Sequence, residues 1–223
     1  MSDTRARILG KVRAALGRET APAPADAASA RAAALGDGTP QRPVWDEAHL
    51  ERFCQCVEAA AGSWVSVATL ADAGLAIAGY LADKPTGKVI HRAPDPALDA
   101  IRWPEDVTVE TATDGRDALV GVSRAVAGVA ETGSLALASG PDNPTTLSFL
   151  PDYHIVVLGE ADVVPWFEDL WQRMREAGGF PPRSFNFVTG PSRTADVEQT
   201  LQLGAHGPRS LHVVLVQGGI TQS

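Results

Sequence analysis

Short apolar runs and helical stretches alternate along the chain from residue 63 onward. The runs SWVSVATL at 63–70, GKVIHRA at 87–93 and VTVETA at 107–112 are rich in β-branched residues, and a helical stretch at 72–81 follows the first of them. Strands that alternate with helices form a parallel or mixed sheet covered by helices. The alternation therefore predicts an α/β fold.

Three further apolar runs follow at 118–122, 126–130 and 134–138, with only a few residues between them. Parallel strands need a crossover of about a dozen residues or more, whereas tight turns join antiparallel neighbours. We therefore expect a mixed, mainly parallel sheet that contains an antiparallel section.

The last third of the chain has the apolar pattern of three more strands, YHIVVL at 153–158, SFNFV at 184–188 and LHVVLV at 211–216. Asp162 is a suitable N-cap for a helix that runs to about residue 177, with Pro165 in its first turn. The final strand is expected to close the sheet.

Residues 1–43 differ from the rest of the chain in composition. Residues 20–43 hold nine Ala, four Pro and two Gly, which is a linker composition with few large apolar groups. We expect an amphipathic helix within residues 1–19, this linker at 20–43, and one folded α/β domain at 44–223. The apolar residues at helical spacing in the first segment are Ile8, Leu9, Val12, Ala15 and Leu16.

The net charge of −8 is unevenly spread, because residues 1–43 hold seven Lys or Arg against four Asp or Glu. The body is therefore acidic and repels a phosphate backbone, which argues against a nucleic acid as the main partner. No uncharged apolar run approaches the roughly 18–20 residues that a membrane helix requires, and the start lacks the apolar core of a secretory signal. We expect a cytoplasmic protein without membrane insertion. The Arg- and Ala-rich start leaves a mitochondrial transit peptide as an alternative.

The chain has two cysteines, Cys54 and Cys56, in a stretch that favours a helix. Positions two apart on a helix point about 200° away from each other, so one metal ion cannot take both thiolates. We expect one buried thiol and one near the surface. Four thiolates for an iron–sulfur cluster are not present, and the dinucleotide, phosphate-loop and zinc motifs are missing, so we expect no cofactor and no metal.

Three polar, glycine-containing segments between apolar strands are the candidate site. The first is Glu131-Thr132-Gly133-Ser134, a turn between two runs that we expect to be buried. Burial would raise the pKa of a carboxyl group there, so Glu131 is a candidate nucleophile or general base, with Thr132, Gly133 and Ser134 as ligand-binding residues. The alternative is a turn carboxylate that faces water or pairs with an arginine.

The second segment, TGPSRTAD, leads into a helix predicted over 195–203. Gly190 allows a sharp turn, and the first free N–H groups of that helix can bind an anion with help from Arg193. Asp196 would repel an anion, and helix capping by Thr194 and Asp196 is the alternative. The candidate ligand-binding residues here are Gly190, Pro191, Ser192, Arg193, Thr194 and Asp196.

The third segment is GAHGP at 204–208, a loop before the final strand. It holds His206 as a candidate catalytic residue and Gly207 as a candidate ligand-binding residue. A histidine alone on a loop is the alternative interpretation. We expect Glu131, Arg193 and His206 to meet in one cleft at the strand ends, where open α/β sheets bind ligands.

The order of these segments resembles the lactate-utilisation protein C family, also described as YkgG-like, whose shared unit is the LUD domain. The resemblance is carried by ETGS at 131–134, PTTLSFLPDYHIVVL at 144–158, and TGPSRTADVE followed by GAHGP. It implies a fold similar to ribose-5-phosphate isomerase and the CoA transferases, in which Glu131 looks most like the carboxylate near the strand ends.

The resemblance also implies a function. The family is linked to oxidation of L-lactate to pyruvate with iron–sulfur and cysteine-rich redox proteins as partners, and this chain would be the cofactor-free subunit or accessory protein. One alternative is a stand-alone enzyme that uses Glu131 on a small carboxylate, a sugar phosphate or an acyl-CoA. The other is a ligand-sensing or scaffold protein.

Overall fold

The computed structural model describes residues 2–17, 42–177, 182–194, 202–203, 207–217 and 220. These residues belong to two compact units, 1–42 and 43–223. Among the residues so described, no helix has the length and apolar character needed to cross a membrane.

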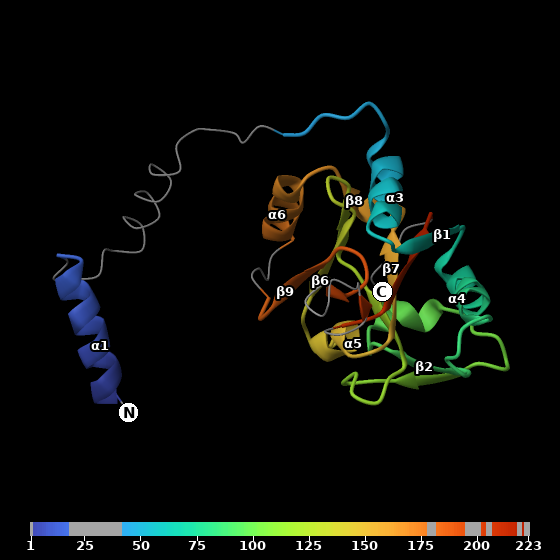
Figure 1. Ribbon diagram of the computed structural model, residues 1–223, viewed down its shortest axis with the longest axis horizontal. Coiled ribbons are helices and arrows are strands. Elements are labelled where there is room, and N and C mark those ends of the chain that lie inside the picture. Colours follow the sequence, from blue (N-terminus) through green and yellow to red (C-terminus); the bar gives the residue numbers. More distant parts are fainter. Residues whose placement is uncertain are drawn as a thin grey trace. The chain divides into compact units, whose positions relative to one another are not determined.

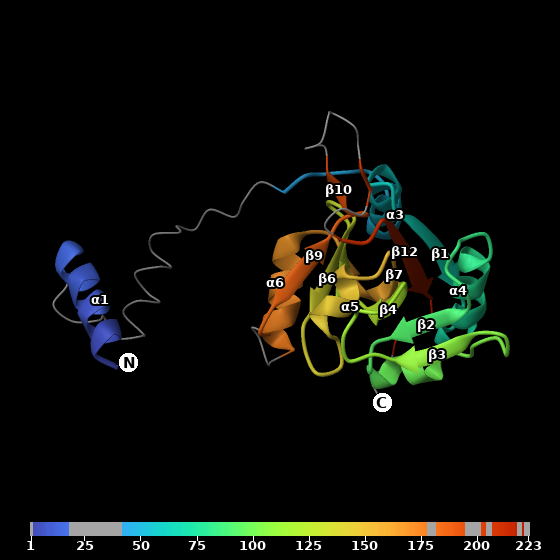
Figure 2. The same ribbon diagram turned by 60° about the horizontal axis from the view of Figure 1, so that its bottom comes forward.

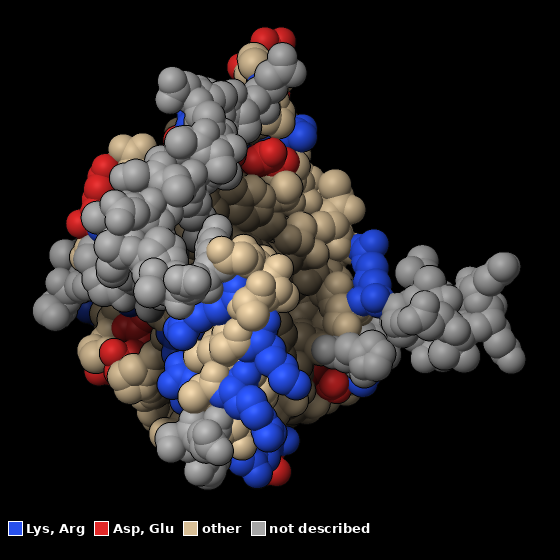
Figure 3. Space-filling view, turned by 90° about the vertical axis from the view of Figure 1, so that its left-hand side faces the viewer, with Lys and Arg blue, Asp and Glu red and all other residues tan. Residues whose placement is uncertain are grey.

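The first unit contains one described helix, α1 (Ser2–Ala15). Lys and Arg side chains gather along the face of α1 that Figure 3 presents. The larger apolar side chains of α1 are also exposed to solvent, as is that of Leu16 just after it. Those on the helix are Ile8, Leu9 and Val12.

The second unit is built on a sheet of six strands that are all parallel (Figures 1 and 2). A connection between two parallel strands must return the chain from the carboxyl end of one strand to the amino end of the next, and a helix usually makes this crossover. In spatial order the strands are β1 (Ser63–Val67), β12 (Ser210–Val216), β7 (Tyr153–Gly159), β4 (Val120–Arg124), β2 (Val89–Arg92) and β3 (Thr108–Thr111).

A second sheet of four strands contains the antiparallel pairing. Two of its three strand pairs are antiparallel, β5 with β6 and β6 with β9, while β5 and β8 are parallel. In spatial order the strands are β8 (Val163–Val164), β5 (Ala127–Val129), β6 (Ser134–Ala138) and β9 (Phe185–Val188).

Helices cover the two sheets, which also pack directly on each other. The cluster on one face of the main sheet includes residues of α4 and α5, whereas the other face packs against α3 and the second sheet. Helix α6 covers the outer face of the second sheet, as Figures 1 and 2 both show. The helices are α3 (His49–Ala59), α4 (Ala73–Leu81), α5 (Thr145–Phe149) and α6 (Phe167–Glu176), with 3-10 turns η1 (Leu70–Asp72), η2 (Pro96–Ala100) and η3 (Glu160–Asp162).

The predicted α/β class is confirmed, but one strand pairing is wrong. The run at 118–122 does not pair with the run at 126–130, because the chain changes sheets between them. The Ala125 N–H donates to the Val157 carbonyl in β7, and the next N–H, that of Val126, donates to the Ala136 carbonyl in β6. A tight connection here joins two sheets and not two antiparallel neighbours.

The helix predicted to start at Asp162 begins at Phe167. Residues 160–164 instead form η3 and the short strand β8, which pairs with β5. Pro165 precedes the helix, and its carbonyl accepts a hydrogen bond from the Glu131 N–H. Asp162 forms an ion pair with Arg173 on α6 rather than capping the helix.

The helix predicted over 195–203 is wrong at its last two positions. Residues 195–201 lie outside the described residues, but β11 (Gln202–Leu203) pairs antiparallel with β10 (Arg193–Thr194). A helix of nine residues would rise by about 13 Å, which would keep its two ends too far apart to pair. Strand pairing therefore replaces the helix at these positions.

Strands β7 and β12 lie in the centre of the main sheet and are buried on both faces. Ile155 of β7 and Val214 of β12 belong to the core under α4, whereas Val156 and Val213 belong to the core under α3. Successive side chains of a strand point to opposite faces, so the two cores share these strands.

The second unit begins with an anchored segment. The Trp166 indole N–H donates to the Pro43 carbonyl at 3.0 Å, and the Trp45 ring lies 5.4 Å from the Trp166 ring, centroid to centroid. The Arg52 guanidinium lies over the Trp45 ring at 5.7 Å. Packing of this kind ties residues 43–45 to the body.

Deletion of residues 1–42 should change the free energy of unfolding of the body by less than about 1 kcal/mol, because residues 20–42 are poor in large apolar groups. Deletion of residues 1–46 should cost about 2 kcal/mol or more, because it removes the Trp45 side chain from its contacts with Trp166 and Arg52. Urea denaturation of both truncated chains measures the difference. Equal stability of the two would contradict the anchoring role of Trp45.

Candidate functional site

Two glycine turns pack against the last turns of α3. Gly133 and Gly190 both have positive φ, at 68° and 81°. A Cβ atom on Gly133 would lie 2.7 Å from the Val57 nitrogen, and one on Gly190 would lie 2.4 Å from the Ala60 carbonyl oxygen. Both glycines are therefore required by conformation and by close approach to the same helix end.

A chain of hydroxyl groups joins the first two predicted segments. The Ser134 hydroxyl lies 2.6 Å from the Thr132 hydroxyl and 2.6 Å from the Thr189 hydroxyl. Ser134 is buried, whereas Thr132 and Thr189 are exposed. The structure thus brings ETGS into direct contact with the TGPSR turn.

The second and third predicted segments also meet. The Ser192 N–H donates to the Pro208 carbonyl at 2.8 Å, and a Cβ atom on Gly207 would lie 3.3 Å from the Ser192 Cβ. Pro191 is half-buried in the same turn. Three segments that are distant in sequence therefore form one cluster.

Arg193 has a contact that accounts for its position. Its guanidinium donates to the Ala60 carbonyl at 2.9 Å, at the C-terminal end of α3. A cation there hydrogen-bonds a carbonyl that the helix leaves free and faces the negative end of the helix dipole. Asp196 and His206 lie outside the described residues, and the structure describes the backbone of Thr194 as part of β10.

Glu131 is held by its backbone. Its N–H donates to Pro165, and its carbonyl oxygen lies 4.0 Å from the Cys56 sulfur. The carboxyl group is half-buried, and it forms neither an ion pair nor a hydrogen bond with another residue of the described part of the chain, Arg193 included. A catalytic role for Glu131, and its meeting with His206 in one cleft, stay predictions.

A cavity of 220 Å³ lies where the clustered turns meet the two sheets. It is at the amino-terminal ends of β7 and β12, where His154 and Leu211 are the second residues of their strands. Open α/β sheets usually bind ligands at the carboxyl ends of their strands, so this position departs from that rule. The lining residues are Ser148, Phe149, His154, Phe187, Val188, Thr189, Gly190, Ser192, Gly207, Pro208 and Leu211.

His154 is a buried polar residue of this cavity. Its Nε2 atom lies 2.7 Å from the Ser123 hydroxyl, and both residues have no exposed surface. Burial lowers the pKa of His154 to about 3, so the ring is neutral at physiological pH. Its Nδ1 atom is buried and has no hydrogen-bond partner among the residues that the structure describes. An unsatisfied buried donor costs about 1–3 kcal/mol.

A second buried histidine mirrors His154 on the opposite face of the sheet. The His212 Nδ1 atom lies 2.8 Å from the Ser63 hydroxyl, and its ring stacks on Tyr80 with centroids 3.8 Å apart. Burial, with the nearby Lys84 charge as a smaller cause, lowers the pKa of His212 to about 4. His212 packs with the aromatic ring and does not line the cavity.

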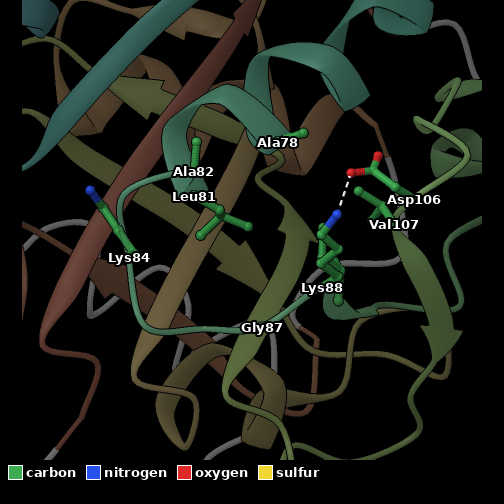
Figure 4. Close-up of a pocket in the computed structure, with 9 residues that line it drawn as sticks. Ala78, Leu81, Ala82, Lys84, Gly87, Lys88, Asp106 and Val107 are labelled. Atoms are coloured by element: carbon green, nitrogen blue, oxygen red, sulfur yellow. Dashed lines mark hydrogen bonds and ion pairs between the residues drawn. The ribbon is translucent and has the colours of Figure 1, made fainter.

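A larger cavity of 430 Å³ lies at the edge of the main sheet between α4, β2 and β3. Figure 4 shows that Lys88 and Asp106 point toward each other across its rim, 2.6 Å apart. Lys84 points away from them, and its ammonium lies 4.5 Å from the centre of the Tyr80 ring and 3.0 Å from Asp83. Both lysines already have partners, which leaves this cavity without a free cation among the residues that line it.

Both cysteines lie on α3, as predicted, and their environments differ. Cys54 is buried, and burial with the charges of Glu58 and Glu160 raises its pKa to about 11. Cys56 is half-buried and contacts the Glu131 carbonyl. Within the part of the chain that the structure describes, no group of three or more His, Cys, Asp or Glu residues is placed to hold a metal ion.

Sequence reasoning missed His154, Ser148 and Ser123. His154 and Ser123 are single polar residues inside the apolar runs YHIVVL and VGVSR, and both are fully buried. A polar residue at a position whose neighbours predict a buried strand is the signal that would have identified them, because buried polar groups need partners.

A parallel six-stranded sheet covered by helices, with a second, mixed sheet packed against it, makes this chain an α/β protein. The model of the LUD domain family matches residues 41–216. The chain is a member of the LUD domain family.

Several relatives share this sequence pattern. "Lactate utilization protein C" of Anoxybacillus flavithermus is 35% identical over 119 residues, which cover 50% of this chain and 53% of that protein. The protein of the same name from Bacillus subtilis is 31% identical over 117 residues, covering 51% and 49%. The uncharacterised protein YkgG of Escherichia coli is 32% identical over 113 residues, covering 49% of each chain. The alignments thus span about half the length of the curated relatives.

The fold is also similar to that of a solved structure. A DUF162 family protein from Deinococcus radiodurans matches with a TM-score of 0.56 and 20% sequence identity, covering 78% of this chain and 99% of that one. At this identity the likeness concerns the fold alone. The similarity to the ribose-5-phosphate isomerase and CoA transferase fold stays a prediction.

Gly190→Ala and Gly133→Ala should each lower the free energy of unfolding by more than about 2 kcal/mol, because positive φ alone costs a residue with a Cβ roughly 1–2 kcal/mol and the new atom also collides with α3. Gly87→Ala is the matched control, since Gly87 has φ 66° but open space around its Cβ position. Chemical denaturation of the three variants measures the difference. A similar loss in all three would show that contact with α3 is unimportant.

The free energy of unfolding should fall as pH decreases from about 6.5 to 4. The folded-state pKa values of His154 and His212 are about 3 and 4, below the value of 6.5 for an exposed histidine. The unfolded chain therefore binds more protons in this range, and each histidine contributes a slope of up to about 1.4 kcal/mol per pH unit. Urea denaturation at several pH values measures the slope.

The double variant His154→Gln/His212→Gln should have a smaller slope over this pH range, whereas the exposed control His49→Gln should keep that of the wild type. An unchanged slope in the double variant would mean that other groups cause the acid sensitivity.

Proposed function

We propose that this chain is a subunit or accessory protein, without a redox cofactor of its own, in a lactate-utilisation system that oxidises L-lactate to pyruvate. Its partners in the proposal are an iron–sulfur protein and a cysteine-rich redox protein. The observation that carries the proposal is membership of the LUD domain family, together with the relatives from Anoxybacillus and Bacillus that are named for lactate utilisation.

The state of the thiols supports the assignment of redox chemistry to the partners. Oxidation of lactate to pyruvate releases two electrons and two protons, so the system needs a group that accepts electrons. Thiolates, and not thiols, bind iron or zinc, and the raised pKa of Cys54 keeps it protonated near pH 7. In the proposal, the electrons pass to the metal or cysteine groups of the partner proteins.

The same thiols have a structural explanation. The Cys54 side chain belongs to the core between α3 and the main sheet, where it packs with Phe53 and Val57. Cys56 contacts the turn that holds Glu131. These contacts support a packing role for both cysteines. Such a role is what we expect if the chain itself carries out no redox chemistry.

The tagged chain, purified by itself, should be colourless and should not reduce an artificial dye with L-lactate. Purified from cells that contain its partners, it should carry iron–sulfur absorbance between 300 and 500 nm and support dye reduction by L-lactate. A double variant, Cys54→Ala/Cys56→Ser, should give the same dye reduction in the assembly once its folding is confirmed by circular dichroism.

Two results would contradict the proposal. One is a stoichiometric flavin or iron–sulfur spectrum in the isolated chain. The other is purification from such cells without any cysteine-rich redox protein. Turnover of a small carboxylate, a sugar phosphate or an acyl-CoA by the isolated chain, abolished by Glu131→Gln, would favour a stand-alone enzyme instead.

A further inference from the structure

The cavity of 220 Å³ beside His154 has the features of a ligand site. We propose that it binds a short monocarboxylic acid of the 2-hydroxy or 2-oxo class, and that the His154 Nδ1–H group donates a hydrogen bond to the ligand. The inference deepens the proposed function and rests on it for the choice of acid. The site itself is argued from the residues of the cavity.

The hydrogen bond to Ser123 determines which ring nitrogen of His154 carries the proton. The Ser123 hydroxyl is fully buried, and the His154 Nε2 atom, at 2.7 Å, is its one partner among the described residues. The hydroxyl hydrogen therefore has Nε2 as its acceptor, and a neutral ring that accepts at Nε2 carries its hydrogen on Nδ1. The result is a buried N–H donor that has no partner in the described part of the chain.

A second polar group of the cavity also lacks a partner. Ser148 is 2% exposed and lines the same cavity, and its hydroxyl makes no hydrogen bond to any other residue that the structure describes. Buried polar groups are almost always hydrogen-bonded to protein, water or ligand. The buried His154 Nδ1 atom is therefore the group that indicates a polar ligand, and the Ser148 hydroxyl on the same cavity can supply a second hydrogen bond.

The walls limit the size of that molecule. Apolar side chains of Phe149, Phe187 and Leu211 line the cavity together with the polar groups. Its volume is below the roughly 300–1,000 Å³ of pockets that hold drug-sized ligands. A ligand of a few heavy atoms, with one polar end and a short apolar part, fits these walls.

The charge of the cavity limits the ligand class further. None of the described residues that line it is Lys, Arg, Asp or Glu. A single carboxylate can be stabilised by N–H and O–H donors, and charge-assisted hydrogen bonds of this kind are strong. A phosphate dianion would bring twice the charge without a cation to offset it. The lining therefore favours a monocarboxylate over a sugar phosphate.

Two substitutions of His154 distinguish the roles of its two ring nitrogens. An Asn amide nitrogen lies close to the place of Nδ1, whereas a Gln amide group lies close to the place of Nε2. His154→Gln should therefore keep a partner for Ser123 and lose the donor toward the ligand. His154→Asn should keep that donor. The matched control is His212→Gln, which changes the equivalent buried histidine on the opposite face of the sheet.

Isothermal titration of the whole purified chain with sodium L-lactate, sodium pyruvate and inorganic phosphate tests the proposal. At least one of the two acids should bind, and phosphate should not compete with it. His154→Gln should weaken the binding by about 10- to 100-fold, as expected for a lost hydrogen bond to a charged group. His154→Asn and His212→Gln should stay within about threefold of the wild type.

NMR of the chain with ¹⁵N-labelled histidine provides a readout that does not depend on a variant. The His154 Nδ1 atom should carry the ring hydrogen, and its resonance should shift when the bound acid is added, while that of His212 should not. Absence of binding by both acids, tighter binding of phosphate, a proton on Nε2, or equal effects of His154→Gln and His212→Gln would each overturn the proposal.

Failure of the proposed acid site can be distinguished from failure of the proposed function. Co-purification of His154→Gln with the iron–sulfur partner measures the subunit role independently of the cavity. Loss of acid binding with retained co-purification supports both proposals, whereas absence of a redox partner from the wild-type preparation counts against the subunit role alone.

Discussion

The central pair of strands, β7 and β12, is the constraint on which the rest of the fold depends. Seven hydrogen-bonded register positions join the pair, and almost every side chain on both faces is buried. A sheet whose middle strands are apolar on both faces must have other elements packed on each face. One face is covered by α4 with its flanking turns, and the other by α3 with the second sheet.

Strands β7 and β12 also carry the two buried histidines, one on each face of the sheet. The chemistry of the cavity and the stability of the core therefore depend on the same strands.

Helix α3 packs between the central strands and the turns of the candidate site. Its inner face packs on the central strands through Phe53, and its C-terminal end is the surface against which the turns of Gly133 and Gly190 close. Arg193 adds a hydrogen bond to the final carbonyl groups of the helix. The turns are therefore positioned by packing against α3 as well as by the hydrogen bonds between them. An arrangement of this kind keeps hydroxyl and N–H groups in place without a ligand, as preorganised binding sites require.

Local pattern was sufficient to predict the α/β class, the central strands and the turns of Gly133 and Gly190, because apolar periodicity and glycine turns are properties of neighbouring residues. It failed where pairing between distant segments decided the structure. Ala125 ends one sheet contact and Val126 begins another, and no local feature marks that change. Likewise, pairing of Arg193 with Leu203 overrides the helical pattern at the end of 195–203. His154 was missed because its importance follows from Ser123, which is 31 residues away in the sequence and reaches its ring only after folding.

The place of β12 between β1 and β7 has a consequence for the order of assembly during synthesis. β1 is made early and lies at the edge of the sheet, where its one parallel neighbour is β12, the latest of the described strands to leave the ribosome. Until residues 210–216 emerge, β1 and β7 have no strand between them, and their backbone N–H and C=O groups are unpaired on the facing sides. A nascent chain therefore has both edges open from the synthesis of β7, which ends at Gly159, until β12 is made. We therefore expect a chain released before residue 210 to expose strand edges that can pair with other chains.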